Sequence, residues 1–278
     1  MCMAPAMIPT GGRYPAMKIV VLVKHVPDAT AERTFSDDKT TDRAGVDGIL
    51  SELDEYAVEE ALTIAEADDG EVVVLTMGPE RAADALRKGL QMGASSAVHV
   101  VDDALHGSDA PATSLVLARV IDKIGGTGHV DLVLTGMAST DGGMSVVPAM
   151  LAERLGLPHI GFVGELTVSG DTVTGRRDGD AASETVEANL PAMVSVTDQI
   201  NEPRYPSFKG IMAAKKKPFE TWSLSDLGVD PSQVGLSAAW SVVGDVTKRP
   251  PRSAGEIVSD DGEGGLKLVE FLAAQKFV

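Results

Sequence analysis

The sequence predicts an α/β protein: a parallel sheet covered by helices, with added antiparallel strands and a C-terminal extension. Short β-branched runs alternate with helical patterns four times in the first half of the chain, which is typical of right-handed crossovers between parallel strands. Hydrophobic residues make up 44% of the chain but aromatic residues only 4%. The core must therefore be aliphatic, which suits parallel strands that are buried on both faces.

Four strand–helix units are expected between residues 18 and 155. Apolar runs bounded by polar residues predict buried strands at 18–23, 71–75, 97–101 and 131–134. Helices are expected to begin at the capping-box spacing of Ser51 and Asp54, at Gly78-Pro79 and at Pro111, and a fourth is expected over 145–155. The polar residues 27–50 are predicted to form a long loop.

The pattern changes after Leu157. Short runs at 162–168, 171–177, 183–188 and 192–197 are joined by tight polar turns, and we expect antiparallel strands that extend or flank the sheet. From Pro203 onward the regular pattern thins out. A long tail without its own core needs another surface to lie on.

These patterns divide the chain into four parts. We expect a disordered leader at 1–17, because its composition lacks the apolar core of a signal peptide. An α/β nucleotide-binding domain is expected at 18–200, followed by a partner-recognition loop at 201–217 and a C-terminal arm at 218–278.

Composition argues against several classes of protein. The net charge of −17 disfavours nucleic acid as a partner, because phosphate groups are bound by basic surfaces. Cys2 is the single cysteine, so an intrachain disulfide is impossible and a cysteine zinc site is strongly disfavoured. No apolar run approaches the roughly 20 residues that span a bilayer. We therefore expect a cytoplasmic protein without membrane insertion.

The carboxyl ends of the strands are the expected ligand site, as in other open parallel sheets. The glycine-rich segment 136–145 follows a strand and precedes a helix, so backbone amides and a helix N-terminus could meet a phosphate there. An ordinary glycine-rich connection explains the same pattern equally well. The sequence contains no Walker-type P-loop, no histidine pair with metal spacing and no nucleophile elbow. A carrier or binding protein is therefore favoured over a hydrolase.

The segment Asn201-Glu202-Pro203-Arg204-Tyr205 is predicted to be an exposed loop stiffened by proline. It leads to the basic run Lys215-Lys216-Lys217 on an otherwise acidic chain, which is typical of a docking surface. The acidic residues that precede it in the chain, Glu55, Glu59, Glu60 and Glu66, are interpreted as a solvated helix face.

Several segments, in one order, carry a resemblance to a known family. They are Leu53-Asp-Glu-Tyr-Ala-Val-Glu-Glu-Ala61, Thr76-Met-Gly-Pro79, Asp131-Leu-Val-Leu-Thr-Gly136 with Asp141, Pro191-Ala-Met-Val-Ser195, and Asn201-Glu-Pro-Arg-Tyr205 with Ile211-Met212-Ala-Ala-Lys-Lys-Lys217. From about Lys18 to its C-terminus the chain resembles the β subunit of electron transfer flavoprotein. The resemblance implies a Rossmann-like fold of the adenine-nucleotide hydrolase-like group.

The resemblance also implies cofactors. FAD would be held mainly by an α subunit, and a structural AMP would bind to this chain. The matching AMP-contacting positions are Leu22, Ser51, Glu52, Leu53, Asp54, Met77, Gly136, Met137, Ala138, Ser139, Thr140, Asp141, Gly142, Gly143, Met144, Ser145, Val146 and Val147. The family often has Asn-Pro at the positions of Ser51-Glu52 and polar residues at 145–147, so backbone amides would carry more of the phosphate binding here.

Docking residues follow from the same resemblance. Phe208 occupies the apolar anchor position of the loop that recognises acyl-CoA dehydrogenase; a phenylalanine tucked against its own domain is the alternative. Asp178 matches an acidic position that pairs with an arginine of the α subunit. The further docking positions are Ile211, Met212, Lys215, Lys216 and Lys217.

The function implied is that of an electron carrier without bond-changing chemistry of its own. It would accept electrons from acyl-CoA and other FAD-linked dehydrogenases, as in fatty acid β-oxidation, and pass them to a membrane quinone oxidoreductase. Two alternatives stay open. One is a stand-alone adenine-nucleotide-binding protein of the stress-protein type, and the other is a bifurcating variant in which a second FAD replaces AMP.

Overall fold

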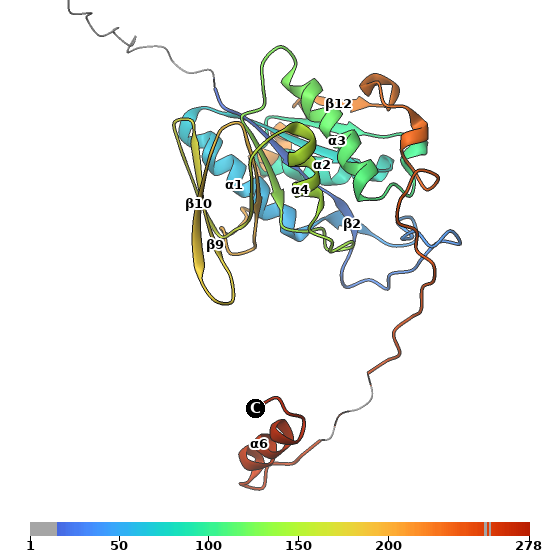
Figure 1. The fold of residues 1–278 in the computed structure, drawn as a ribbon, viewed down its shortest axis with the longest axis vertical. Helices are drawn as coiled ribbons and strands as arrows, with labels where there is room; N and C mark the ends of the chain where they lie inside the picture. Colours follow the sequence, from blue (N-terminus) through green and yellow to red (C-terminus); the bar gives the residue numbers. More distant parts are fainter. Residues whose placement is uncertain (1–15, 253–254, 256) are drawn as a thin grey trace, which may run out of the picture. The chain divides into compact units, whose positions relative to one another are not determined.

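The computed structural model describes residues 16–252, 255 and 257–278, and its centre is a seven-stranded parallel sheet in the order β12-β5-β4-β1-β6-β11-β7. This confirms the predicted α/β class (Figure 1). The sheet strands are β1 Lys18–Leu22, β4 Glu71–Met77, β5 Ser96–Val100, β6 Leu132–Gly136, β7 His159–Val163, β11 Ala192–Val196 and β12 Phe219–Trp222.

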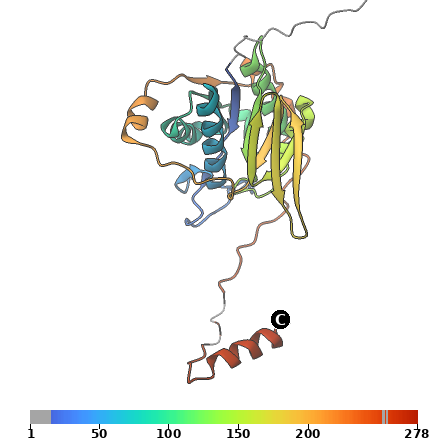
Figure 2. The ribbon, with the colours of Figure 1, turned by 90° about the vertical axis from the view of Figure 1, so that its left-hand side faces the viewer.

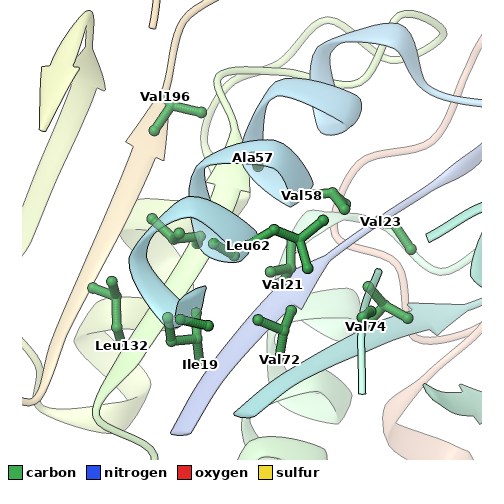
Figure 3. Packing of buried hydrophobic residues seen from close by; sticks show 14 of the residues in the cluster. Ile19, Val21, Val23, Ala57, Val58, Leu62, Val72, Val74, Leu132 and Val196 are labelled. Carbon is green, nitrogen blue, oxygen red and sulfur yellow. The ribbon is translucent and has the colours of Figure 1, made fainter. Parts of the chain in front are cut away.

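Helices cover both faces of this sheet. The α-helices are α1 Glu52–Asp68, α2 Ala83–Met92, α3 Ala110–Gly125, α4 Val147–Leu155, α5 Phe208–Ala214 and α6 Gly264–Ala274, and short 3-10 turns are η1 Glu80–Ala82, η2 Asp103–Leu105, η3 Ser225–Leu227 and η4 Pro231–Gln233. Ile19 and Val21 of β1 pack in the core under α1 and α2, whereas Val20 belongs to the core on the α3 and α4 side. Figure 3 shows α1 lying across the strands on the first of these faces. The alternation follows from the two-residue period of a strand.

Two smaller antiparallel sheets accompany the main one. Strands β8 Glu165–Ser169, β9 Thr172–Asp178 and β10 Ser183–Asn189 form a three-stranded sheet, seen in yellow in Figure 2. Gly175 of β9 lies so close to β7 that an added Cβ would meet Val163 at 2.9 Å. Strands β2 His25–Pro27 and β3 Gly48–Leu50 pair at the two ends of the segment that we predicted to be a loop.

The predicted antiparallel direction is wrong for one strand. β11 lies between β6 and β7 and runs parallel to both. All of its residues are buried, as expected for an apolar run inside a parallel sheet. Between β7 and β11 the chain forms the separate sheet of β8, β9 and β10. It then re-enters the main sheet parallel to β7, and no local sequence pattern predicts this direction. The run 162–168 likewise spans two strands, β7 and β8.

The chain after Pro203 is more regular than its sequence pattern predicts. Helix α5 follows, and β12 then adds to the edge of the main sheet parallel to β5. The contacts divide the chain into one compact unit that ends at Gly244 and a second that begins at Asp245 and contains α6. The segment 218–278, predicted as an arm, therefore begins inside the sheet.

The predicted leader 1–17 lies outside the described residues except for Ala16 and Met17. The carbonyl of Met17 accepts a hydrogen bond from the amide of Glu71 at 2.7 Å, so this residue already belongs to the sheet. Among the helices that the structure describes, none is long and apolar enough to cross a membrane.

Candidate functional site

The predicted ligand residues meet at the carboxyl ends of β4, β1 and β6, which are neighbours in the sheet. Leu22, Met77 and Gly136 end these three strands. Ser51 is the N-cap of α1, and an added Cβ on Gly136 would meet Asp54 Oδ1 at 2.6 Å. The start of α1 therefore lies directly against the end of β6, and only a glycine allows this approach.

Asp54 joins the loops that follow β1 and β6. Its Oδ2 accepts a hydrogen bond from the backbone amide of Lys24 at 2.8 Å. Burial raises the pKa of the Asp54 carboxyl to about 7, although the backbone amides of Lys24 and Gly136 and the charge of Lys24 oppose the shift. Asp54 thus holds the two loops together rather than facing solvent.

Asp141 lies between two cations at the tip of the glycine-rich loop. Its side chain is only 4% exposed, and Lys24 Nζ and Arg43 Nη2 approach its carboxylate oxygens at 2.8 and 2.6 Å. Burial acts to raise the pKa of Asp141, but the charges and hydrogen bonds of Lys24 and Arg43 outweigh it and hold the pKa well below its usual range. Arg33 Nη1 donates to the carbonyl of Thr140 at 3.1 Å.

Lys24, Arg33 and Arg43 are residues of the candidate site that the sequence reasoning did not name. Lys24 lies in the loop 24–30 that follows the first strand, at the edge expected to bind a ligand, and Arg33 and Arg43 lie in the segment 27–50 that is predicted to be a long loop. Their positive charge gathers at an edge predicted to bind phosphate, so a count of basic residues in the strand-end loops could have indicated them.

The glycine-rich loop closes on itself. The hydroxyl of Ser139 accepts hydrogen bonds from the amide of Gly142 at 3.3 Å and from Lys24 Nζ at 3.4 Å. Gly143 and Ser145 have φ of +62° and +56°, and Ser145 adopts this left-handed conformation without being a glycine. Val147 begins α4 directly behind the loop.

Three buried hydroxyls at this edge have no hydrogen-bond partner among the described residues: Ser51 Oγ, Thr76 Oγ1 and Thr135 Oγ1. They lie at the N-cap of α1 and near the ends of β4 and β6. A buried hydroxyl without a partner costs about 1–3 kcal/mol. These orphaned groups, together with Lys24 and Arg43, fit a polar, anionic ligand such as a nucleotide.

The second predicted site, residues 201–217, is not a free loop. Asn201 Nδ2 donates to the carbonyl of Tyr56 and to Glu60 Oε2, both at 3.1 Å. Arg204 donates hydrogen bonds to the Glu59 carboxylate from Nε at 2.7 Å and from Nη2 at 2.9 Å. Its Nη2 also donates to Glu66 at 3.2 Å.

These contacts overturn part of the interpretation of the acidic residues as a solvated helix face. Glu59 and Glu60 are only 9% and 8% exposed, because residues 201–204 lie over them. Only Glu66 keeps an exposed position on the same stripe of α1. A charged side chain is buried in this way only when it has a partner.

Helix α5 presents apolar side chains to solvent. Tyr205 and Phe208 are 93% and 81% exposed, and Ile211 and Met212 are exposed as well. Ser207 caps the helix by accepting a hydrogen bond from the amide of Gly210 at 3.0 Å. Phe208 therefore does not pack against its own domain.

The three lysines of the basic run, 215–217, differ in their contacts. Lys215 and Lys216 are exposed, and no side-chain hydrogen bond is found for them among the described residues. Lys217 is half-buried and donates to the carbonyls of Leu90 and Gly93 at 3.0 and 2.9 Å, and burial lowers its pKa. Lys217 caps helix α2, so it is a structural residue.

Asp178 lies apart from both sites, at the end of β9. It is exposed, and Arg176 Nη2 lies 3.0 Å from its carboxylate. Across the same hairpin Arg177 pairs with Glu184 at 2.6 Å. The turn between these strands is closed by a hydrogen bond from the amide of Gly179 to the carbonyl of Ala182.

The fold defines the class: an α/β protein with a Rossmann-like parallel sheet. A family model described as the electron transfer flavoprotein domain matches residues 38–227. The chain belongs to the electron transfer flavoprotein β-subunit family, which makes it the small subunit of a flavoprotein electron carrier.

Individual members of the family align with nearly the whole chain. The electron transfer flavoprotein subunit beta of Mycobacterium tuberculosis (strain ATCC 25618 / H37Rv) is 49% identical over 266 residues, which cover 94% of this chain and 99% of that protein. The protein of the same name from Mycobacterium leprae is 50% identical over the same coverage. The caffeyl-CoA reductase-Etf complex subunit CarD of Acetobacterium woodii is 35% identical, with 87% of this chain and 92% of CarD covered.

Proposed function

We propose that this chain pairs with an α subunit and accepts electrons from acyl-CoA and other FAD-linked dehydrogenases in the cytoplasm, for delivery to a membrane quinone oxidoreductase. The observation that carries the proposal is the exposed apolar face of α5 beside the exposed cations Lys215 and Lys216. Such a face, raised on an otherwise acidic protein, suits transient contact with a protein donor. The name of CarD, a subunit of a reductase complex, is consistent with partners of this class.

AMP is the proposed ligand of the strand edge. The residues that would hold it are the loop 136–147, residues 51–54, Leu22 and Met77. Lys24 and Arg43 would face its phosphate, and the orphaned hydroxyls of Ser51, Thr76 and Thr135 would gain partners. FAD, held mainly by the α subunit, would supply the electron-transfer chemistry.

Two further contacts are proposed with the α subunit. Asp178, exposed at the end of its hairpin, would pair with an arginine of that subunit. The second compact unit, from Asp245 onward, would pack on it as the C-terminal arm. These contacts would be permanent, unlike the contact that the dehydrogenase makes with α5.

Co-expression with an electron transfer flavoprotein α subunit from the same organism tests the proposal. We expect a yellow heterodimer that contains one FAD and one AMP, measured by absorbance and by chromatography of the extracted nucleotides. Two FAD without AMP would support the bifurcating variant. A stable monomer that binds no α subunit and hydrolyses ATP would support the stand-alone nucleotide-binding protein.

A substitution tests the AMP site separately. Arg43→Gln removes one of the two cations proposed to face the phosphate and should lower the AMP content of the heterodimer at least about twofold, because a charge-assisted contact to the phosphate is lost. Arg119→Gln, which changes an exposed arginine of α3, is the matched control. Equal AMP content in both variants would contradict the assignment.

A further inference from the structure

The exposed face of residues 201–217, formed by Tyr205, Phe208, Ile211 and Met212, has little apolar support from its own domain. Every residue of α5, all of which the structure describes, is exposed or half-buried. An open pocket of about 400 Å³ is lined by Leu90 and Gln91 of α2 and by Ile211 of α5. In Figure 2, α5 is the orange helix at the side of the body. Ala214 of α5 packs against the hydrophobic core, but no residue of the helix is fully buried, so apolar packing contributes only part of what holds it in place.

Three contacts, which we call ties, fix the segment 201–217 to α1 and α2. The first tie holds the beginning of this segment. Arg204 binds Glu59 with two nitrogens and reaches Glu66 as well. Its backbone amide also donates to Glu59 Oε2 at 3.0 Å. Glu59 and Glu66 lie on one stripe of α1 because they are two helical turns apart. A planar guanidinium can bridge them, whereas an ammonium offers no such fork.

A second tie lies in the middle of the segment. Gly210 sits directly on the C-terminal turn of α2, where an added Cβ would meet the carbonyl oxygen of Gln91 at 2.6 Å. Backbone cannot yield as a flexible side chain does, so any larger residue would push α5 away from α2. Gly210 therefore sets the distance between the two helices.

A third tie closes the segment. The last turn of α2 contains no basic residue, and Lys217 supplies one from 124 residues further along the chain, donating to the carbonyls of Leu90 and Gly93. A cation at this end satisfies carbonyls that the helix leaves unpaired and favours the helix dipole. The next element is β12, which is fixed in the sheet.

We propose that Arg204, Gly210 and Lys217 are positioning residues that hold the apolar face of α5 in the orientation in which a dehydrogenase meets it. This inference rests on the proposed function for the identity of the partner, but not for the ties themselves. A face that is already ordered loses less conformational entropy on binding than a mobile loop does. On this proposal α1 and α2 form the base of the docking surface, and Lys217 acts through α2 rather than by touching the partner.

Hydrogen exchange on the full-length chain tests the ties without any partner. We expect amides of α5 to exchange about tenfold faster in Lys217→Met and in Arg204→Gln than in the wild type, because local opening becomes easier. Lys217→Arg keeps the donor and should restore slow exchange. Lys209→Met removes an exposed lysine of α5 and should change nothing. Unchanged exchange in Lys217→Met and Arg204→Gln would overturn the proposal.

Reduction kinetics of the heterodimer test the consequence. With a dehydrogenase as donor, Lys217→Met and Gly210→Val should raise KM about fivefold to tenfold at nearly constant kcat, the pattern of weakened binding. Reduction of the same variants by dithionite, which needs no docking, should equal that of the wild type. Faster exchange with an unchanged KM would overturn the positioning role in docking, whereas the proposed donor surface is tested separately by Phe208→Ala. An unchanged KM for Phe208→Ala alongside a raised KM for Gly210→Val would instead contradict only the anchor role of Phe208.

Discussion

Helices α5 and α6 both leave their residues exposed or half-buried, yet they are held in different ways. In the described part of the chain, α5 is flanked by ties to α1 and α2 over sequence separations of 124 to 145 residues. The polar contacts of α6 are local, such as Lys267 with Asp261 and the amide of Gly264 with Asp260. The apolar face of α5 is ordered before any partner binds, which suits transient contact with a dehydrogenase. The exposed apolar side chains of α6 suit burial in a permanent interface with the α subunit.

Deletion of residues 245–278 should have the largest effect. If α6 is covered by the α subunit, the truncated chain should bind that subunit about 100-fold more weakly or not at all. The thermal unfolding of the α/β unit should hardly change, because Val234 is the last buried hydrophobic residue among those that the structure describes. Affinity measured by titration and a melting curve test both parts. An unchanged affinity would show that α6 is not the permanent contact.

Arg204→Ala should lower the free energy of unfolding by about 2 kcal/mol at pH 7, because Glu59 loses its partner while it stays largely buried. Arg119→Ala, an exposed arginine of α3, is the control and should cost less than about 0.5 kcal/mol. Denaturant unfolding measures both. Equal losses in the two variants would mean that the first tie contributes little.

The effect of Arg204→Ala should depend on pH. Burial acts to raise the pKa of Glu59, but the hydrogen bonds and charge of Arg204 outweigh it and lower the pKa below 4.5. A lowered pKa contributes stability that is present above pH 4.5 and is lost as the pH falls through the folded-state pKa. The difference between Arg204→Ala and the wild type should therefore shrink at low pH, and a constant difference would contradict this linkage.

Phe208→Ala should weaken docking of the dehydrogenase without changing the stability of the fold. We expect kcat/KM with a dehydrogenase to fall about 30-fold, the equivalent of about 2 kcal/mol for the loss of an aromatic anchor. The free energy of unfolding should change by less than about 0.5 kcal/mol, because the side chain is exposed. Phe35→Ala removes an exposed phenylalanine from a different loop and should leave both quantities unchanged. Wild-type kinetics in Phe208→Ala would defeat the anchor role.

Glu60→Gln should have the smallest effect on the free energy of unfolding, and it should raise that energy rather than lower it. Burial raises the pKa of Glu60, the repulsion from Glu59 adds to the shift, and the hydrogen bond from Asn201 opposes it. A raised pKa contributes stability that is lost as the pH rises through the folded-state pKa. Glutamine stays neutral and still accepts from Asn201, so the variant should be about 0.5 kcal/mol more stable than the wild type at pH 8. Greater stability of the wild type at pH 8 would contradict this account.

The main-sheet strands and the α-helices of the first 155 residues could be predicted from the sequence by itself, whereas β2 and β3 could not. The apolar run of β1, the N-cap Ser51 and the glycine-rich loop before α4 are each defined by residues close together in the chain. The strand-end location of the predicted ligand residues also followed, because the carboxyl ends of parallel strands meet at one edge. Leu22, Met77 and Gly136 lie there as expected.

Only the tertiary structure decided the rest. The parallel direction of β11, the return of β12 to the sheet and the burial of Glu59 all depend on segments that meet after long excursions of the chain. Arg204 and Glu59 are separated by 145 residues, and Lys217 and Leu90 by 127. Hydrophobic periodicity is a local property that reports which face of an element is buried. The partner of a charge depends on where the rest of the chain passes, and no local pattern contains that information.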